Sequence, residues 1–397
     1  MTACGISVFH LVSMRIAIIT ESFAPDLNGV ANCVQRVADH LVQRGHQPLI
    51  IAPEPASTTR GAHSGPFPYP VERVPSVSLP GYPGFRLGLP SRAIRSALVR
   101  HGTDLVHLAS PVFLGATGST VTRHLGLPAI AVYQTDIPAY ARAYGWHGAG
   151  EAAAWRWLRR IHNGAERTLA PSTAVMTQLK AHGFERLWLW GRGVDLACFG
   201  PGNRSDELRR ELAPGGEVIA GYVGRLATEK RVDLLAGVAG LPGVRLAVVG
   251  GGPAAAALRE RMPTAVFLGE QRGAQLARTY ASLDVFVHSG PHETFGQTLQ
   301  EAAASGVPVV APAAGGPLDL VDHGVTGFLT EPGNGAAITE TVARLAADPA
   351  LRAAQGAAGR QKVQSRTWAA LGDKLIGHYA AVLRPGAQRG RPAGAAA

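Results

Sequence analysis

Two glutamates with seven residues between them stand in the stretch of this chain whose residues best fit a chemical role. Glu293 and Glu301 lie in GPHETFGQTLQEAAASGVP, at 290–308. The apolar residues before this stretch predict a strand, and 294–304 predicts a helix with Thr294 as its N-cap. One carboxylate would then lie at a strand-to-helix junction and the other two turns down the helix. An isolated pair of glutamates with this spacing more often belongs to an ordinary capped helix with one exposed glutamate. The neighbouring residues must therefore distinguish a functional site from such a helix.

Between the two glutamates, the amides of Phe295 and Gly296 fall in the first turn of the predicted helix. Free amides at the positive end of a helix favour an anionic group such as a phosphate. Carboxylates on either side of that group can accept hydrogen bonds from hydroxyls. The combination suits a nucleotide sugar, with sugar hydroxyls at one end, ribose hydroxyls at the other and a diphosphate between them.

Two cations follow a predicted strand at 218–223. Arg225 can hold phosphate oxygens with its guanidinium fork, and Lys230 offers a compact charge to a departing diphosphate. A solvated basic loop is the commoner alternative, but the end of a strand favours the functional interpretation. Gly29 follows the first strand and lets backbone approach a diphosphate closely, unless it only forms a tight turn.

Metal binding is not predicted. The chain has no Asp-x-Asp and no His/Cys cluster with metal-ligand spacing. The three cysteines are far apart, which fits a reducing cytoplasm. We therefore expect neither a metal nor another cofactor, and the charge of a leaving diphosphate would be met by Arg225, Lys230 and helix amides.

Length and pattern predict an α/β protein of two domains. A chain of 397 residues, 46% hydrophobic, is too long for one ordinary core. Short runs rich in Val, Ile and Leu alternate with helical patterns, as in parallel sheets covered on both faces. The predicted strands are 15–20, 48–52, 71–74, 105–109, 129–133, 168–170, 187–190, 218–223, 245–249, 265–268, 285–287 and 309–311.

We expect two Rossmann-like domains in tandem, at 14–192 and 193–366, with the ligand in the cleft between them. We expect residues 1–13 to be a mis-assigned start or a disordered lead-in, and they do not resemble a signal peptide. Residues 75–90 predict an exposed loop, and 367–384 a closing helix. The tail 385–397 is expected to be disordered.

Charge points to anionic partners. The formal net charge is +10, and residues 1–195 alone carry 18 basic against 11 acidic side chains, a net of +7. This excess could attract a phosphate-rich ligand or an anionic membrane face, although Arg-rich genomic composition explains it equally well. Nucleic acid is not an expected partner, because the chain lacks a recognised binding motif. No run is long and apolar enough to span a membrane.

Taken together, the motifs resemble the family 4 retaining glycosyltransferases of the GT-B fold, over roughly 14–383. The matching features are the turn at 28–30, GRLATEK at 224–230, VVGGGP at 248–253, the glutamate pair, and GGPLDLVDHGVTGFL at 315–329. The segments ITESFAPDLNGV, VHLASPVFLGATG, AVYQTDIPAYARAYG, TLAPSTAVM, GRGVDLACF and FVHSGPHETFGQ narrow the resemblance to actinobacterial GDP-mannose-dependent α-mannosyltransferases that act on glycolipids. The fold would place two Rossmann-like domains across a cleft, with the C-terminal helix crossing back to the first.

The resemblance also implies residue roles. Gly29 would contact the diphosphate, and Arg225 and Lys230 would hold it. Glu293 would accept hydrogen bonds from the donor sugar, and Glu301 would bind the ribose.

Four other residues are candidates for sugar or acceptor contacts. Gln134 stands where many relatives carry histidine, and it cannot shuttle a proton. Asp136 is the nearest ionisable substitute, unless it only caps the next segment. Arg192 either reaches the cleft or links the domains, and His107 either lines the acceptor side or is an ordinary strand-end histidine.

The implied activity is transfer of mannose from GDP-mannose, with retention, to a lipid or glycolipid at the cytoplasmic membrane face. An apolar loop with Tyr82, Phe85 and Leu87, and the arginines Arg92, Arg95 and Arg100 on the following helix, could meet anionic headgroups or merely be solvated. The alternatives are a UDP-sugar donor, a nucleotide-sugar epimerase, a pyridoxal-phosphate-dependent phosphorylase and a non-catalytic nucleotide-sugar-binding protein.

Overall fold

The computed structural model describes residues 13–26, 28–55, 67–79, 82–109, 111–138 and 148–384. The described chain forms two compact units. The first holds the residues up to Val132, Gly164–Arg167 and the stretch from Ile376 onward. The second holds Tyr133–Asn163 and Thr168–Leu375. The predicted tail and all but the last residue of the predicted N-terminal extension lie outside the described residues.

The first half of the chain builds a seven-stranded sheet in the order β3-β2-β1-β6-β7-β8-β9. The recorded registers along this sheet are parallel. Its strands are β1 (Arg15–Thr20), β2 (Gln47–Pro53), β3 (Val71–Val74), β6 (Leu105–Ala109), β7 (Ala129–Val132), β8 (Arg167–Ala170) and β9 (Leu187–Leu189). The helices of this half are α1 (Gly29–Gln43), α2 (Arg92–His101), α3 (Leu114–His124), α5 (Ala149–His162) and α6 (Thr173–Ala181).

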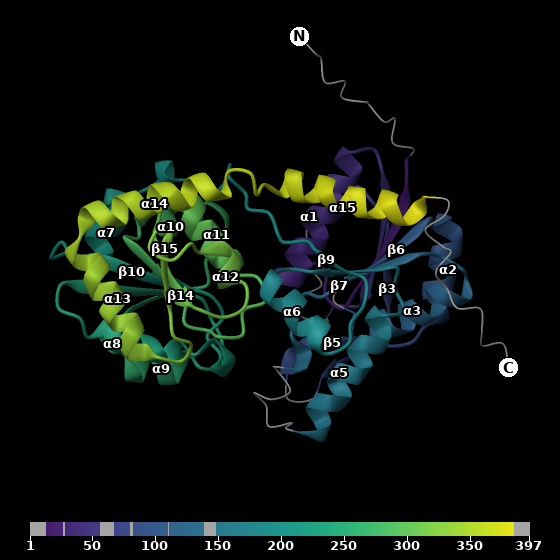
Figure 1. Ribbon diagram of the computed structural model, residues 1–397, viewed down its shortest axis with the longest axis horizontal. Helices are drawn as coiled ribbons and strands as arrows, with labels where there is room; N and C mark the ends of the chain where they lie inside the picture. Colours follow the sequence, from purple (N-terminus) through teal and green to yellow (C-terminus); the bar gives the residue numbers. More distant parts are fainter. Residues whose placement is uncertain are drawn as a thin grey trace, which may run out of the picture. The chain divides into compact units, whose positions relative to one another are not determined.

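The second half builds a six-stranded parallel sheet in the order β12-β11-β10-β13-β14-β15. Figure 1 labels β10, β14 and β15 of this sheet. Its strands are β10 (Val218–Val223), β11 (Val244–Val249), β12 (Val266–Gly269), β13 (Val285–Val287), β14 (Val309–Pro312) and β15 (Gly327–Thr330). Its helices are α7 (Asp206–Leu212), α8 (Ala236–Ala239), α9 (Ala255–Arg261), α10 (Gly273–Ser282), α11 (Gln297–Ala304), α12 (Pro317–Leu320), α13 (Gly335–Ala347) and α14 (Pro349–Val363).

Both faces of this second sheet are buried, which explains its uninterrupted apolar strands. On β10, Ile219 and Val223 belong to the core of one face, and Ala220 and Tyr222 belong to the core of the other. Because successive side chains point to opposite faces, a strand covered on both sides must be apolar throughout. Packing on both faces therefore requires apolar residues within the strands, and polar residues occur at the ends of the strands.

Three predicted features differ from the structure. Residues 75–90 are not a loop: β4 (Ser76–Leu79) and β5 (Tyr82–Gly88) form an antiparallel pair, joined by Arg86 bonds to Ser76 and Ser78. The side chains of Tyr82 and Phe85 lie outside the described residues. Strand β15 was not predicted, because its four residues are preceded by the turn residues of VDHGVTG. Helix α11 begins at Gln297 rather than at 294.

The predicted closing helix is α15 (Trp368–Leu383). It starts beside residue 194, where Val194 forms a parallel bridge with Thr367. Its C-terminal part belongs to the first unit, in which the Tyr379 hydroxyl lies 2.7 Å from Nδ1 of His107 on β6. The helix therefore returns to the first half of the chain, as predicted. Among the described helices, none combines the length and apolarity needed to cross a membrane.

Candidate active site

The strongest cluster of charged groups lies at the carboxyl ends of β10 and β13. Lys230 follows β10, and its Nζ lies 2.9 Å from Oε2 of Glu293, which follows β13. The lysine side chain is 21% exposed and the glutamate 18%, so the pair is largely buried. Parallel strands place their carboxyl ends at one edge of the sheet, and ligands of such folds bind there. The structure therefore brings together two of the three residues predicted to be catalytic.

The other oxygen of Glu293 closes the turn that leads into α11. Oε1 accepts hydrogen bonds from the amides of Gly296, at 3.1 Å, and Phe295, at 3.5 Å. These two amides were predicted to be open to an anion in the first turn of the helix, and that part of the prediction was wrong. Gly296 has φ +101°, so α11 starts only after it, and the glutamate's own carboxylate fills the place of the expected anion. Thr294 is likewise not the N-cap; its hydroxyl donates to the Gln134 carbonyl oxygen at 3.3 Å.

Opposing effects set the charge of Glu293. Burial acts to raise the pKa of this carboxyl, but Lys230, His288 and Arg192 act against burial and lower the pKa to about 2. The carboxylate is therefore ionised at any physiological pH. It can accept hydrogen bonds but cannot donate a proton.

A two-glycine segment packs against the backbone of the Glu293 turn. A Cβ on Gly315 would lie 2.2 Å from the carbonyl oxygen of Glu293, and one on Gly316 would lie 2.0 Å from that of Phe295. The Gly316 amide also donates to the Glu293 carbonyl at 2.8 Å. Only residues without side chains fit here, so the motif at 315–317 sets the position of the turn.

Gly315→Ala is expected to reduce activity about ten- to a hundredfold, because an added methyl group must displace the Glu293 turn by about an ångström. Gly324→Ala is the matched control: both glycines have positive φ, +63° and +81°, but no atom lies within 4 Å of a Cβ on Gly324. Each variant should lose about 1 kcal/mol of stability from backbone strain. Thermal unfolding and donor turnover measure the two effects separately. Equal activities of the two variants would contradict the role given to Gly315.

Sequence reasoning missed His288, which immediately follows β13. Its side chain is 3% exposed, and its Nε2 lies 3.8 Å from Oε2 of Glu293. Burial lowers the pKa of His288 to about 4, so the ring is neutral at physiological pH. A histidine placed directly after an apolar strand, at the same sheet edge as the glutamate, is the signal that could have identified it.

Arg225, the third predicted catalytic residue, is paired differently. Its guanidinium donates to Glu229 one helical turn further along the chain, and Glu229 is 7% exposed. The Arg225 carbonyl accepts from the Tyr222 hydroxyl at 3.1 Å. Both contacts hold the loop after β10 in place, and the Arg225 side chain is still about one third exposed.

Glu301 lies one turn into α11, closer to its start than the predicted two turns. Its Oε2 accepts from the Tyr280 hydroxyl at 3.0 Å. Burial raises the pKa of Glu301 to about 7, although hydrogen bonds from Tyr280 and Gln297 oppose the change. The carboxyl is therefore partly protonated near neutral pH when no ligand is bound.

This raised pKa predicts a pH-dependent stability. Because the folded protein binds the Glu301 proton more tightly than the unfolded chain, stability falls as pH rises from about 4.5 towards 7. The loss attributable to this group is up to about 3 kcal/mol, at about 1.4 kcal/mol per pKa unit. Glu301→Gln should remove that part of the loss. Relative to the wild type, the unfolding midpoint of the variant should therefore rise as the pH increases from 5 to 8. Parallel midpoint–pH curves would contradict the assignment.

The remaining predicted residues fall into two groups. Arg192 Nη2 donates to Oε1 of the buried Gln134 at 3.0 Å, and Arg192 also lowers the pKa of Glu293, so both residues lie near the site. The other three have local contacts. Asp136 accepts from the Tyr133 hydroxyl at 3.2 Å, His107 is buried under Tyr379, and Gly29 is the first residue of α1, capped by Asn28. His107 is thus an ordinary buried histidine at the end of a strand, the second of the two alternatives given for it above.

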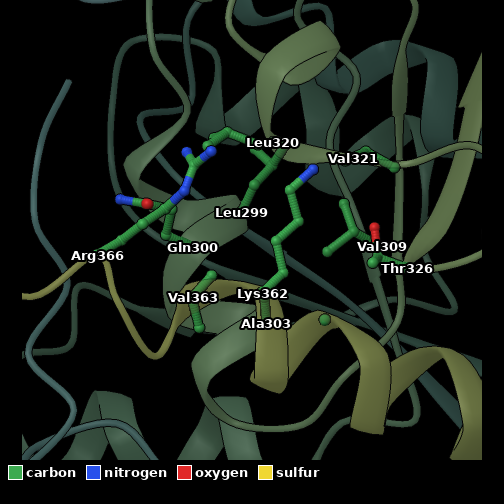
Figure 2. A pocket seen from close by; sticks show the side chains of 11 residues that line it. Leu299, Gln300, Ala303, Val309, Leu320, Val321, Thr326, Lys362, Val363 and Arg366 are labelled. Atoms are coloured by element: carbon green, nitrogen blue, oxygen red, sulfur yellow. The ribbon is translucent and has the colours of Figure 1, made fainter. Parts of the chain in front are cut away.

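A separate small pocket lies beneath α11 and does not contain these groups (Figure 2). Its lining includes Leu299, Gln300, Leu320, Lys362 and Arg366. Lys362 Nζ is paired with Asp322 at 2.7 Å. The pocket is a packing gap between α11, α12 and α14, and we assign no catalytic role to it.

Comparisons with known proteins identify the family of the chain. The family model described as "Glycosyltransferase Family 4" matches residues 27–197, and the model "Glycosyl transferases group 1" matches residues 203–362. A GDP-mannose-dependent alpha-mannosyltransferase of Mycolicibacterium smegmatis is 49% identical, over 93% of this chain and 98% of its own length. A protein of the same name from Mycobacterium tuberculosis is 47% identical, over 94% of this chain and 98% of its own length.

More distant proteins share the architecture. A GDP-mannose-dependent alpha-(1-6)-phosphatidylinositol dimannoside mannosyltransferase of Mycobacterium tuberculosis is 26% identical over 75% of this chain and 79% of its own. The crystal structure of Anabaena Alr3699/HepE in complex with UDP superposes with a TM-score of 0.76 at 21% identity, covering 93% of this chain and all of that one. The chain is a glycosyltransferase of the GT-B fold and belongs to glycosyltransferase family 4, with the GDP-mannose-dependent α-mannosyltransferases among its relatives.

Proposed function

We propose that this enzyme transfers mannose from GDP-mannose, with retention of configuration, to a lipid or glycolipid at the cytoplasmic face of the membrane. The donor is inferred from the names of relatives that are up to 49% identical over nearly the whole chain. The chemistry rests on one observation, the largely buried pair of Lys230 and Glu293 at the strand ends. A cation and an ionised carboxylate held side by side suit a glycosyl phosphate, because the cation can bind the phosphate and the carboxylate can accept hydrogen bonds from the sugar.

Each group has one task in the proposed reaction. Lys230 and Arg225 bind the diphosphate and stabilise its charge as the glycosidic bond breaks, because fixed cations act strongly in a site that excludes water. Glu293 accepts hydrogen bonds from mannose hydroxyls, and Glu301 accepts them from the ribose. As the bond from the sugar to the diphosphate breaks, the acceptor hydroxyl forms the new bond from the same face and gives its proton to the departing phosphate oxygen. The configuration is therefore retained, and no carboxylate attacks the sugar.

The proposal assigns the leaving-group charge to side chains rather than to a metal ion. Among the described residues no group of three or more His, Cys, Asp and Glu side chains could hold a metal. Excess EDTA is expected to leave turnover unchanged. A loss of turnover that Mg²⁺ or Mn²⁺ restores would require a metal bound with the donor.

The proposal of a lipid acceptor at the membrane rests on the surface of the first half of the chain. Arg92 and Arg95 are exposed on α2, and Val99 on the same helix is 58% exposed. Arg100 is exposed too but pairs with Glu72 at 2.9 Å. Arginines beside exposed apolar side chains suit anionic headgroups. Flotation with anionic liposomes at low salt tests membrane contact, and no flotation would remove this part of the proposal.

Release of nucleoside diphosphate with and without acceptor tests the function itself. Purified enzyme is incubated with GDP-mannose, UDP-glucose or GDP-glucose, alone and with extracted membrane lipids. We expect rapid release of GDP only when GDP-mannose and lipid are both present, together with a mannosylated lipid in the product. Conversion of the sugar nucleotide without lipid would favour an epimerase, and binding without turnover would favour a non-catalytic protein.

A further inference from the structure

Lys230 has two partners in the proposed reaction, Glu293 and the leaving diphosphate. In the structure its ammonium lies 2.9 Å from Glu293 Oε2. To stabilise the leaving diphosphate, the ammonium must turn to the phosphate oxygens. Glu293 would then lose its nearest cation while it is still largely buried. Oε1 keeps its bonds from the Gly296 and Phe295 amides, but Oε2 loses its charged donor. A buried carboxylate oxygen without a donor is unfavourable, so another donor to Oε2 would favour release of the lysine.

His288 is the group placed to provide that donor. Its Nε2 lies 3.8 Å from the same Oε2 that Lys230 binds, and a shift of less than about 1 Å would bring the two atoms into hydrogen-bond range. Both ring nitrogens are buried, and neither meets full hydrogen-bond geometry with a described residue, although a contact with the Gly290 backbone raises the pKa of the ring. Buried polar atoms without partners are rare and call for an explanation. A partner acquired only when the ligand binds is such an explanation.

The backbone around His288 supports this use. The His288 amide donates to the Val310 carbonyl at 2.8 Å, which anchors the residue to β14. Gly290 packs between the two competing donors: a Cβ there would lie 3.3 Å from the Lys230 Cα and 3.5 Å from His288 Nε2. The charged groups that act on the ring are Lys230 and Glu293. A neutral imidazole can donate to the carboxylate without repelling the ammonium that it replaces.

We propose that His288 is a positioning residue, whose Nε2–H takes over Glu293 Oε2 when Lys230 turns to the diphosphate of the donor. This rests on the proposed function, which gives Lys230 and Glu293 their roles. The handover keeps the carboxylate charged and aimed at the sugar while the cation moves to the leaving group. His288 acts only through these two residues and touches neither donor nor acceptor.

A pair of substitutions tests the handover. The side-chain amide nitrogen of glutamine can replace Nε2, whereas that of asparagine falls short, near Nδ1. With GDP-mannose and extracted lipid as substrates, His288→Asn should lose about ten- to a hundredfold in kcat/KM, as for a lost hydrogen bond to a charged group. His288→Gln should recover most of that loss. Equal activities of the two variants, or wild-type activity in both, would overturn the proposal.

Nucleotide binding gives a readout that a merely structural role would not move. Calorimetry should show GDP bound about tenfold or more weakly by His288→Asn, because Lys230 stays on Glu293, whereas GMP, which has no β-phosphate, binds as in wild type. Equal weakening of both nucleotides would mean general damage and would contradict the handover.

The unmodified enzyme provides a second test that does not depend on how the variants fold. In a sample labelled with ¹⁵N-histidine, saturating GDP should shift the Nε2 signal of His288, identified by its absence from His288→Gln, to that of a hydrogen-bonded N–H. An unchanged signal at saturation would overturn the proposal. Failure of the proposed function itself would look different: GDP would still bind, and no mannose would be transferred.

Discussion

Replacing Lys230 by alanine is expected to lower kcat at least about a hundredfold, because the variant loses a fixed cation that the transition state needs most. The KM for GDP-mannose should also rise, because Lys230 moves from Glu293 to the diphosphate when the donor binds. Initial rates of GDP release in the presence of lipid acceptor measure both quantities. Thermal unfolding of the same sample shows whether the loss reflects a damaged fold.

Lys362→Ala is the matched control for this experiment. Lys362 is also 21% exposed and also pairs with a carboxylate, Asp322, at 2.7 Å. It differs from Lys230 in lying on α14 at the small pocket of Figure 2 rather than at the strand ends. Its removal should leave turnover unchanged. If the two alanine variants had the same kcat, Lys230 would not be the leaving-group cation.

Glu293→Gln is expected to reduce mannosyl transfer about a hundredfold while GDP still binds within a fewfold of wild type. Glutamine keeps one oxygen, which can accept from the Gly296 amide, so the turn should keep its shape. It loses the charge and the second acceptor, which the sugar hydroxyls require. Lys230 is released from its partner, so phosphate binding should not suffer.

Comparing GDP with GDP-mannose in calorimetry separates these effects, because only the second carries a sugar. Glu270→Gln serves as the control, since Glu270 is a solvent-exposed glutamate paired with Arg272 at 3.6 Å. Full transfer activity in Glu293→Gln would rule out the sugar-binding role. Loss of GDP binding in the same variant would instead show that the carboxylate supports the phosphate site.

Most strands and the chemistry at their ends could be predicted from the sequence because they depend on local patterns. A strand buried on both faces is a short apolar run, and β10 and β13 have the predicted boundaries. Polar residues directly after such runs must gather at one sheet edge. Lys230 and Glu293 follow two such runs, so their contact at that edge is the expected consequence.

The parts that could not be predicted depend on contacts between residues far apart in the chain. Nothing near Gly315 in the sequence reveals that its missing side chain makes room for the Glu293 carbonyl. The start of α11 was misplaced because a left-handed Gly296 follows a residue that looks like a cap. His288 was overlooked because its importance comes from the neighbouring carboxylate and from the burial that keeps its ring neutral.

A crystal structure of the enzyme with intact GDP-mannose tests the central claim most directly. We predict that the diphosphate is held by Lys230 and Arg225, that mannose hydroxyls donate to Glu293, and that ribose hydroxyls donate to Glu301. Lys230 should then have left Glu293. A donor bound away from the ends of β10 and β13, or a diphosphate that contacts neither cation, would contradict this account.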